Sequence, residues 1–336
     1  MRKLATLRRI DTVRPIPDAD AIECAVIGGW TVVVKKGEFA PGDLAVYCEI
    51  DSWIPTTLAP FLSRGQEPRV YDGIAGERLR TVKLRGQLSQ GLLLPYATVG
   101  RICAEGEDVS SELGIVKWEA PVPAQLAGEV RGAFPGFIPK TDQERIQNLS
   151  AEFAEYTELA WEVTEKLDGS SMTVYVYDDD FGVCSRNLNL RDTETNTLWQ
   201  VAHREQIITA ILDSGRNLAV QGELIGEGIQ GNPYRLRGQS FFVFDIYDID
   251  AGHYLRPAER QLFCSDHELQ HVPVIAHTAR LLDTLGIASM ENVLKFAEGA
   301  SVLHASAERE GVVFKCTDRP LSFKAISNRF LLKGGN

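Results

Sequence analysis

A Pro- and Gly-rich segment, WEAPVPAQLAGEVRGAFPGFIP, interrupts the chain at residues 118–139. Proline lacks a backbone donor and glycine favours turns, so neither residue supports a continuous strand or helix here. The chain has 336 residues, and single hydrophobic cores seldom grow past about 250–300 residues. We therefore predict two domains, at residues 1–120 and 137–336, joined by a linker at 121–136.

The first 120 residues alternate short apolar segments with turn signals. Strand-like segments occupy residues 30–36 (WTVVVKK), 43–51 (DLAVYCEID) and 78–86 (RLRTVKLRG), and turns are expected at PDAD, APGD and SRGQEP. Short strands at this spacing are typical of a small barrel or sandwich. The stretch resembles the OB-like domain that precedes the catalytic domain in some RNA ligases, so we predict an N-terminal OB-like β-barrel.

The segment RLRTVKLRGQLSQG carries the most positive charge in this first domain. Alternation along a strand sends Arg78 and Arg80 to one face and Lys83 and Arg85 to the other. These four residues are candidate nucleic-acid contacts, because Lys and Arg neutralise phosphates. Solvated surface charge is an equally good interpretation of a two-faced pattern, and both remain open at this point.

The second part mixes strands and helices without regular βαβ alternation, which indicates antiparallel sheets with packed helices. The predicted fold class is α+β. Helices are predicted at residues 192–212 and 258–270. Strands are predicted at residues 163–166, 171–179, 181–187, 218–226, 240–248, 311–316 and 321–327.

Charge and cysteine content exclude several classes of protein. The formal net charge of −11 argues against non-specific coating of nucleic acid, and the acidic excess lies after residue 120. The six cysteines include no CxxC pair, which argues against a zinc cluster or a disulfide framework. The N-terminus lacks the apolar stretch of a secretory signal, so we expect a cytoplasmic protein.

The sequence HELQH at residues 267–271 matches the HExxH pattern of zinc metalloproteases, and His277 has the spacing of a third ligand. Zinc binding by His267 and His271 requires both on one face of a continuing helix. Pro273 disfavours helical geometry at Val272, directly after that pair. Histidines on a helix surface are therefore the preferred interpretation, with a zinc protease as the alternative.

The sequence GEGIQG at residues 226–231 matches the GxGxxG pattern of dinucleotide-binding proteins. Such a site needs a helix directly afterwards, because the helix N-terminus faces the pyrophosphate. The residues that follow, NPYRLRG, contain a proline and a glycine and predict no helix. This segment is interpreted as a loop.

A different constellation surrounds Lys166, in the sequence EKLDG. A lysine amine is a nucleophile only when it is deprotonated, so it needs neighbours or a metal ion that lower its pKa. Several charged or aromatic residues occur at or near strand ends further along, where a nucleotide site could use them. They are Arg186 in SRN, Glu223 in GEL, Phe244 and Asp245 in FDIY, Glu310 and Lys315 in EGVVFK, and Lys324 in SFK.

In this order the elements resemble the motifs of the covalent nucleotidyltransferases, the superfamily of ATP-dependent ligases and mRNA capping enzymes. The segments FIPKTDQERIQN, SRN and FFVFDIY are similar to those of the RNA ligase 2 group. Together with the OB-like N-terminus, they resemble the RNA ligase 5 type over nearly the whole chain.

The resemblance implies that Lys166 attacks the α-phosphate of ATP to give lysyl-AMP. It implies a Mg²⁺ or Mn²⁺ hydrate held by Asp168, Glu223 and Glu310, since hard cations prefer oxygen ligands. AMP would then pass to an RNA 5′-phosphate, and a 3′-OH would displace it to seal nicks in duplex RNA. The residues implied to contact the nucleotide are Arg145, Glu165, Arg186, Glu223, Phe244, Lys315 and Lys324. We expect a monomer with no membrane partner.

One position departs from the family pattern. Ser322 stands where the last motif usually has a lysine, so the motif depends on Lys324. A capping enzyme or DNA ligase typically continues into an OB domain, but only 12 residues follow Lys324. The alternative of another class is a non-catalytic RNA-binding protein with a ligase-like fold.

Overall fold

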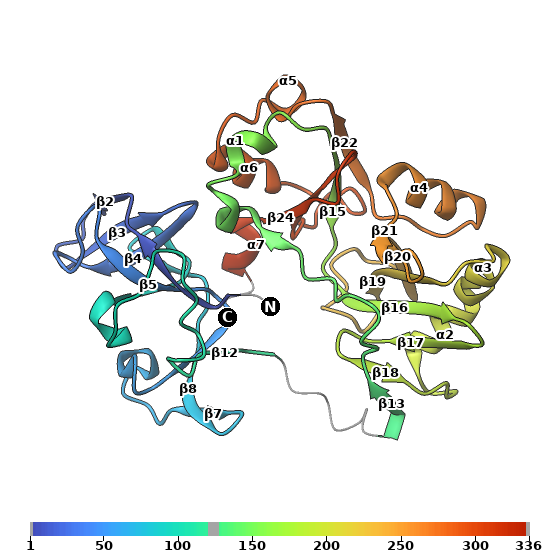
Figure 1. The fold of residues 1–336 in the computed structure, drawn as a ribbon, viewed down its shortest axis with the longest axis horizontal. Coiled ribbons are helices and arrows are strands. Elements are labelled where there is room, and N and C mark those ends of the chain that lie inside the picture. The colour runs from blue at the N-terminus through green and yellow to red at the C-terminus, as the bar shows by residue number, and fades with distance from the viewer. Residues whose placement is uncertain (1–2, 120–127, 334–336) are drawn as a thin grey trace. The chain divides into compact units, whose positions relative to one another are not determined.

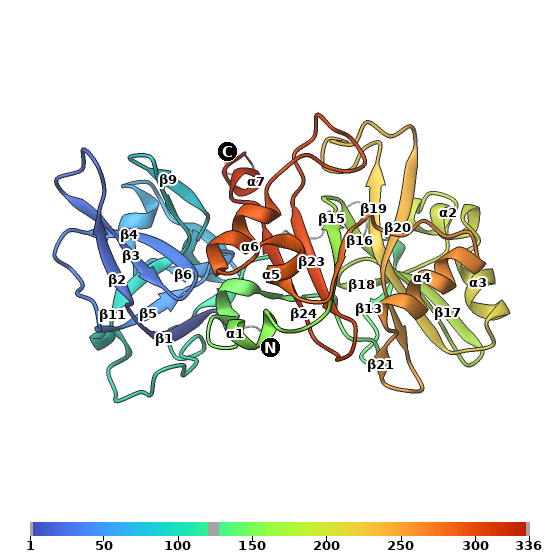
Figure 2. The same cartoon turned by 90° about the horizontal axis from the view of Figure 1, so that it is seen from above.

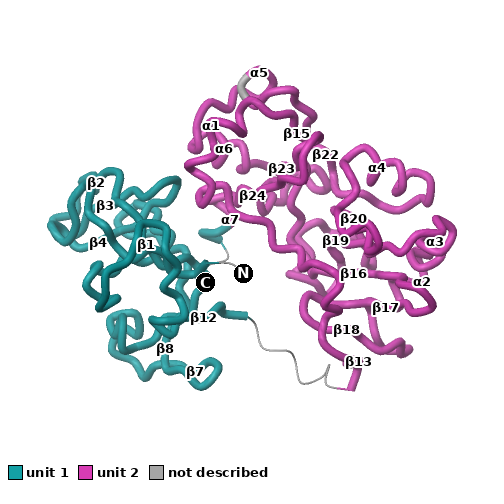
Figure 3. Tube along the Cα trace, in the orientation of Figure 1, with its two compact units in different colours: residues 1–121, 331–336 teal, residues 122–330 magenta. Residues whose placement is uncertain are grey.

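The computed structural model describes residues 3–119 and 128–333, and the chain divides into two compact units (Figures 1 and 3). Unit 1 comprises residues 1–121 with 331–336, and unit 2 comprises residues 122–330. Residues 121–127 of the predicted linker lie outside the described residues. Residues 130–133, in the rest of that segment, form an edge strand of unit 2.

Unit 1 consists of short antiparallel strands. Inward-facing residues alternate along them, as in β4, where Trp30, Val32 and Val34 are buried and the residues between them are less so. Its sheets have the orders β1-β5-β11, β2-β3-β4, β12-β6-β8-β7 and β9-β10. The strands are β1 (Ala5–Arg9), β2 (Thr12–Pro15), β3 (Ile22–Ile27), β4 (Trp30–Lys35), β5 (Leu44–Cys48), β6 (Ser52–Pro55), β7 (Arg69–Tyr71), β8 (Ile74–Arg78), β9 (Val82–Leu84), β10 (Gln87–Ser89), β11 (Leu92–Pro95) and β12 (Val116–Lys117).

The strand predicted at residues 78–86 is two strands in different sheets. β8 ends at Arg78, and β9 begins at Val82 in a separate hairpin with β10. Between them Leu79 is buried in the core and donates its N–H to the Ser52 carbonyl. The need to bury this leucine breaks the alternation that a single strand would require.

Unit 2 contains two sheets. The seven-stranded sheet has the order β13-β18-β17-β16-β19-β20-β21, and the five-stranded sheet has the order β14-β24-β23-β15-β22 (Figures 1 and 2). Their strands are β13 (Val130–Ala133), β14 (Glu144–Arg145), β15 (Trp161–Lys166), β16 (Ser170–Tyr177), β17 (Asp180–Cys184), β18 (Leu188–Leu190), β19 (Leu218–Gly226), β20 (Gln239–Asp248), β21 (His253–Tyr254), β22 (Val274–Thr278), β23 (Gly311–Cys316) and β24 (Ser322–Ile326). Pairing between these strands is antiparallel except for β14 with β24, which is parallel.

Helices cover one face of each sheet in unit 2. Trp199, Ile211 and Phe263 pack with residues of the seven-stranded sheet, and Trp161 and Phe314 lie in the core of the five-stranded sheet. The opposite face of β15 carries the buried polar residues Glu162 and Thr164, followed by Lys166. The helices are α1 (Phe153–Tyr156), α2 (Thr197–Arg204), α3 (Ile207–Asp213), α4 (Pro257–Asp266), α5 (Leu281–Leu285), α6 (Met290–Ala297) and α7 (Asn328–Lys333).

The helix predicted at 192–212 begins later and is interrupted. Asn196 caps α2 by accepting from the backbone N–H groups of Leu198 and Trp199, which fixes the later start. Gln206 has a left-handed backbone (φ 53°) and separates α2 from α3. Within the described residues no helix has the length and apolar character needed to cross a membrane.

The helix predicted at 258–270 ends at Asp266. Glu268 is left-handed (φ 55°), and the N–H of Leu269 donates to the Cys264 carbonyl. This is a Schellman ending, which glycine usually provides. Since the helix stops there, the helical frame that a zinc site on HELQH requires is absent, and the prediction of a helix-surface position is wrong for His271.

Candidate active site

Lys166 is the last residue of β15, and its side chain is half-buried. Its Nζ atom lies 2.7 Å from Oε2 of Glu310, the residue before β23. Lys166 pairs with Gly311 in the antiparallel register of β15 and β23. A Cβ atom at Gly311 would lie 2.2 Å from the Ala325 carbonyl oxygen, so only glycine lets β24 approach this closely.

The KLDG turn packs against β19, which carries Glu223. A Cβ at Gly169 would lie 2.4 Å from the Leu224 carbonyl oxygen. The N–H of Asp168 donates to the Tyr234 hydroxyl at 2.6 Å, and Ser171 pairs with Glu223 in the sheet register. The turn therefore brings Lys166 and Asp168 beside Glu223 of the other sheet.

Three carboxylates act electrostatically on the one ammonium. Burial lowers the pKa of Lys166, but Glu310, Glu223 and Asp168 outweigh it, and the pKa lies above its ordinary value. Burial raises the pKa of Glu223 to about 8, although Lys166 opposes the shift. Burial, together with Glu310, raises the pKa of Asp168 to about 6. Burial therefore favours the protonated, uncharged form of Glu223 at neutral pH.

This donor set suits a hard divalent cation. Carboxylate oxygens are the ligands that Mg²⁺ and Mn²⁺ prefer, and the raised pKa values show that burial disfavours the charged carboxylates of Glu223 and Asp168. Over residues 3–119 and 128–333, no three Asp, Glu, His or Cys side chains are close enough to hold a metal ion directly. The arrangement fits a metal that keeps waters between itself and the carboxylates, as Mg²⁺ commonly does.

Two predicted cations meet on neighbouring strands of the five-stranded sheet. Arg145 on β14 is buried and pairs in parallel register with Lys324 on β24. Lys324 is in turn opposite Val313 of β23, which pairs with Thr164, two residues from Lys166. Alternation along β15 places Thr164 and Lys166 on the same face. Arg145 and Lys324 thus lie on strands of the same sheet as Lys166.

Arg186 follows β17 and is exposed. Its Nη2 atom lies 2.9 Å from Oδ1 of Asp142, and its charge lowers the pKa of Glu223. Arg186 is therefore within electrostatic range of the carboxylate cluster, although it is engaged by Asp142.

Glu165 points away from Lys166, since neighbouring strand residues face opposite sides. Its Oε2 atom accepts from the Val302 N–H at 2.7 Å, and its Oε1 atom is buried without a hydrogen-bond partner. Burial raises the pKa of this carboxyl, although hydrogen bonds from Ser301 and Val302 oppose the shift.

Phe244 is half-buried on β20 and packs with an apolar cluster that includes Leu167 of the KLDG turn. Lys315 on β23 donates to the Phe244 carbonyl, and its Nζ atom lies 2.5 Å from Oδ1 of Asp245. Lys315 pairs with Glu162, which is four residues before Lys166. At about 3.3 Å per residue, Lys315 is therefore about 13 Å from Lys166 along the strand direction. Burial lowers the pKa of Lys315 to about 8.

Ser322 lies directly opposite Lys315 in the register of β23 and β24. A lysine here, as the family pattern usually has, would place two ammonium groups on one face of neighbouring strands. Like charges in this position are destabilising. The departure from the family pattern is therefore consistent with the position that Lys315 occupies.

The two alternative motifs do not form ligand sites. The Nε2 atom of His271 accepts a hydrogen bond from Arg260 at 2.9 Å, so this nitrogen is already used. Residues 227–238 form a loop after β19, so the GEGIQG sequence lies in a loop from its second residue onward.

The four basic residues of unit 1 have different surroundings. Arg78 is 2.6 Å from Asp51 and its guanidinium lies 3.9 Å from the centre of the Trp118 ring, so it is held within the domain. Arg80 is half-buried after β8, whereas Lys83 and Arg85 are exposed on the β9–β10 hairpin. Arg78 therefore has contacts within the domain, whereas Lys83 and Arg85 are accessible to solvent.

Arg260 of α4 is fully buried in unit 2, beside Glu162 and Asp245, and no feature of the sequence predicts its position. It bonds Glu162 of β15 and lies 3.7 Å from Asp245 of β20. Arginine in a helix is ordinarily a surface residue. Only the placement of α4 shows that this one is internal.

A lysine that lies next to carboxylates at a strand end, in a domain that follows an OB-like domain in the sequence, is the arrangement of a nucleotidyltransferase. The RNA ligase family model matches residues 159–333, and a model of an OB-fold domain matches residues 4–96. The chain belongs to the RNA ligase family. The predicted fold class, an OB-fold followed by antiparallel sheets with packed helices, is confirmed, and RNA is its substrate class.

Structures of the RNA ligase of Naegleria gruberi are similar over almost the whole length. A mutant with AMP and Mn is 48% identical with a TM-score of 0.90, and the match covers 98% of each chain. The same enzyme with PPi is 48% identical with a TM-score of 0.90 and 99% coverage of each chain. Another mutant, with ATP and Mn, is 48% identical with a TM-score of 0.89 and 98% coverage of each chain. No curated protein sequence matches the chain.

Proposed function

We propose that this protein joins an RNA 3′-OH to an RNA 5′-phosphate in nicked duplexes, using ATP and Mg²⁺ or Mn²⁺. The observation that carries the proposal is the contact of Lys166 with Glu310 inside a cluster of three carboxylates. Structures of the Naegleria enzyme with ATP and Mn, with AMP and Mn, and with PPi support these ligands.

In the first step the neutral amine of Lys166 attacks the α-phosphorus of ATP. An N–P bond forms, the bond from the α-phosphorus to the bridging oxygen breaks, and pyrophosphate leaves with the bonding electrons. The amine must lose its proton beforehand, and Glu310 is the nearest group that can accept it. A divalent cation bound through Asp168, Glu223 and Glu310 would supply positive charge that favours the neutral amine and the developing phosphate charge.

The other residues would hold the nucleotide. Arg145 and Lys324 offer fixed positive charge to the phosphates on the approach to Lys166, and Arg186 could exchange Asp142 for a ribose or phosphate oxygen. Phe244 would stack on adenine. The buried Oε1 atom of Glu165 lacks a donor, and the exocyclic amine of adenine is a donor of the right kind.

In the two later steps a 5′-phosphate oxygen of RNA attacks the AMP phosphorus and releases Lys166, giving an RNA-adenylate. The RNA 3′-OH then attacks the 5′-phosphorus, AMP leaves, and a phosphodiester is made. The exposed Lys83 and Arg85 of unit 1 would contribute phosphate contacts to the RNA.

The test is to incubate the protein with ATP labelled at the α-phosphate and then with a nicked RNA duplex. Label should appear on the polypeptide in an acid-labile, base-stable bond and then be released as AMP as the nick closes. A protein that binds the duplex without ever becoming labelled would instead be the non-catalytic RNA-binding alternative.

A further inference from the structure

Strand β20 contains a bulge at Phe244. Asp245 pairs with Gln221 of β19, but Val243 pairs with Gly222, so Phe244 is an extra residue without a partner in this ladder. A bulge of one residue shifts every later side chain to the other face of the strand. The buried core confirms the shift, because Phe241 and Val243 precede the bulge in that core and Ile246 follows it.

The bulge turns Asp245 toward the polar face of the sheet. Gln221 and Glu223 are two residues apart on β19 and share a face, and they pair with Asp245 and Phe242. Without the extra residue, Asp245 would point into the apolar core, where an unpaired carboxylate is costly. The bulge therefore sets the positions of both Phe244 and Asp245.

Side chains from other elements hold this irregular backbone. Lys315 donates to the Phe244 carbonyl and contacts Asp245 at 2.5 Å. Val243 donates to the Gln270 carbonyl at 2.8 Å and accepts from the Val272 N–H at 3.0 Å. Gln270 and Val272, at the end of HELQH and directly after it, thus supply backbone partners to the residue before the bulge, and Lys315 supplies a side-chain partner to the bulge itself.

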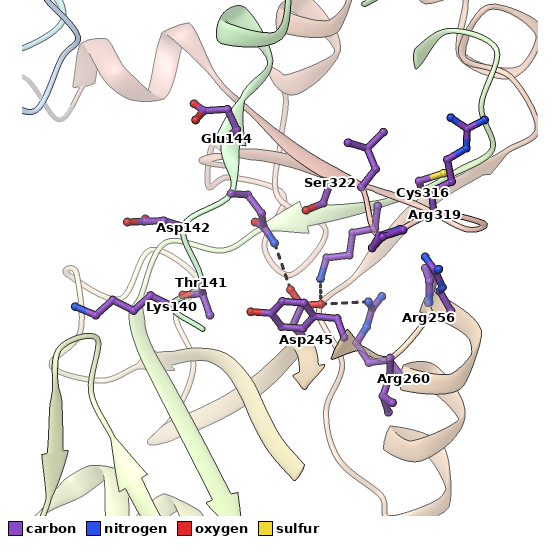
Figure 4. A pocket seen from close by; sticks show the side chains of 17 residues that line it. Lys140, Thr141, Asp142, Glu144, Asp245, Arg256, Arg260, Cys316, Arg319 and Ser322 are labelled. Carbon is purple, nitrogen blue, oxygen red and sulfur yellow. Dashed lines mark hydrogen bonds and ion pairs between the residues drawn. The ribbon is translucent and has the colours of Figure 1, made fainter. Parts of the chain in front are cut away.

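Arg260 connects these groups to the strand of Lys166. Its Nε atom donates to His271 at 2.9 Å, Nη2 bonds Glu162 of β15, and Nη1 lies 3.7 Å from Asp245. Asp245 contacts Arg260, Lys315 and Gln143, and dashed lines meet at it in Figure 4, beside a cavity of about 320 Å³. We call Glu162, Arg260, His271, Asp245 and Lys315 the Arg260 network.

We propose that Arg260 is a positioning residue for nucleotide binding, which acts through Asp245 and Lys315 to fix the bulge that carries Phe244. The proposal rests on the proposed function, in which Phe244 stacks on the base. In this proposal Lys315 affects nucleotide binding through the bulge and not by contacting the nucleotide, because its ammonium already contacts the Phe244 carbonyl and Asp245.

The geometry explains why the effect should fall on base binding. When Arg260 is removed, Asp245 keeps only Lys315 as a charged partner and Glu162 loses its buried counter-ion. The bulge then loses part of its support, and the ring of Phe244 is less often in the stacking position. Lys166, Glu310 and Glu223 keep their own contacts, so the chemical step should change less than ATP affinity.

The experiment compares Arg260→Gln, Arg260→Lys and Lys315→Gln with the wild-type protein. We expect KM for ATP in lysyl-AMP formation to rise about tenfold or more in Arg260→Gln and Lys315→Gln, with the maximal rate within about threefold. Arg260→Lys should recover part of the loss, since lysine keeps the charge but not the planar fork. Calorimetry should show weaker AMP binding and unchanged binding of inorganic pyrophosphate.

Arg216→Gln is the matched control, because Arg216 contacts Asp248 of the same strand at 2.7 Å, beyond the bulge. This variant should keep the wild-type KM. The inference is overturned if folded network variants keep wild-type AMP affinity, if the control shifts equally, or if pyrophosphate binding falls with AMP binding. If Arg260→Gln does not fold, Lys315→Gln decides, since it retains the Arg260–Glu162 pair. AMP binding needs no catalysis, so failure of the proposed function would be recognised separately, as absence of labelling in the wild-type protein.

Discussion

Lys166 and Glu310 are 144 residues apart in the sequence, and their side chains meet at 2.7 Å. The contact joins the end of β15 to the start of β23 and holds the lysine as an ammonium ion. Because neighbouring carboxylates raise the pKa of Lys166, its amine is protonated at neutral pH until the balance of charge around it changes.

Replacing Lys166 with alanine should abolish labelling of the protein by α-labelled ATP, because no other side chain would form the phosphoramidate. Sealing of RNA supplied with a 5′-adenylate should partly persist, since that step uses no lysine nucleophile. Gel analysis of both reactions checks the prediction. Persistent labelling of the variant would show that a different residue is the nucleophile.

Glu223→Gln should separate activity from stability. Burial raises the pKa of Glu223 to about 8, so its ionised form is disfavoured in the folded protein, and an amide removes that cost. We expect a melting temperature, without divalent metal, equal to or above that of the wild type. The rate of lysyl-AMP formation should fall by at least about 100-fold. A variant that adenylates normally would exclude Glu223 from the site.

Ser322→Lys tests the cross-strand position opposite Lys315. We expect a loss of about 0.2–1 kcal/mol in the free energy of unfolding, since two ammonium groups would share one face. In a Lys315→Gln background the same substitution should cost less. Denaturant titration of the four proteins gives the coupling energy, and a coupling of zero would mean that the two side chains do not interact.

His271 should make stability depend on pH. Burial, with the Arg260 charge, lowers the pKa of His271 to about 4 from an ordinary value of 6.5. Between these pH values the unfolded chain binds a proton that the folded chain does not, so stability falls as pH decreases from 6.5 to 4, by up to about 1.4 kcal/mol per pH unit. His271→Gln should flatten this dependence in denaturant titrations.

Lys83→Ala with Arg85→Ala should weaken RNA binding without affecting lysyl-AMP formation. Each lost phosphate contact lowers the slope of log affinity against log salt by about 1, so the pair should lower it by about 2. Arg78→Ala should act differently and reduce thermal stability, because Arg78 packs on Trp118 and Asp51. An unchanged salt slope in the double variant would assign RNA binding to another surface.

The charged residues of the site could be predicted because each belongs to a short motif that places a charge within or next to an apolar strand. Lys166, Glu223 and Glu310 follow this rule, and the structure brings them together through the KLDG turn and the β15–β23 register. Their spacing in the sequence carries no distance information, so the resemblance to a family supplied the grouping.

The bulge at Phe244 could not be predicted, since nearly every residue of FFVFDIY is apolar. Without alternating polar and apolar residues, the sequence cannot show where the face of the strand changes. The bulge is a property of pairing with β19, which only the folded sheet defines. The end of α4 could not be predicted either. The residue that adopts the left-handed conformation there is Glu268, whereas a glycine at this position would have predicted a helix end.

The register of β15 with β23 and β24 has a consequence for the newly made chain. A polypeptide that ends between residues 166 and 309 contains Lys166 but lacks Glu310 and strand β23, which pairs with β15. We expect such a fragment not to form lysyl-AMP, so ATP would be consumed only after β23 has paired with β15. Labelling by ATP can therefore serve as a measure of how many chains in a preparation have completed folding.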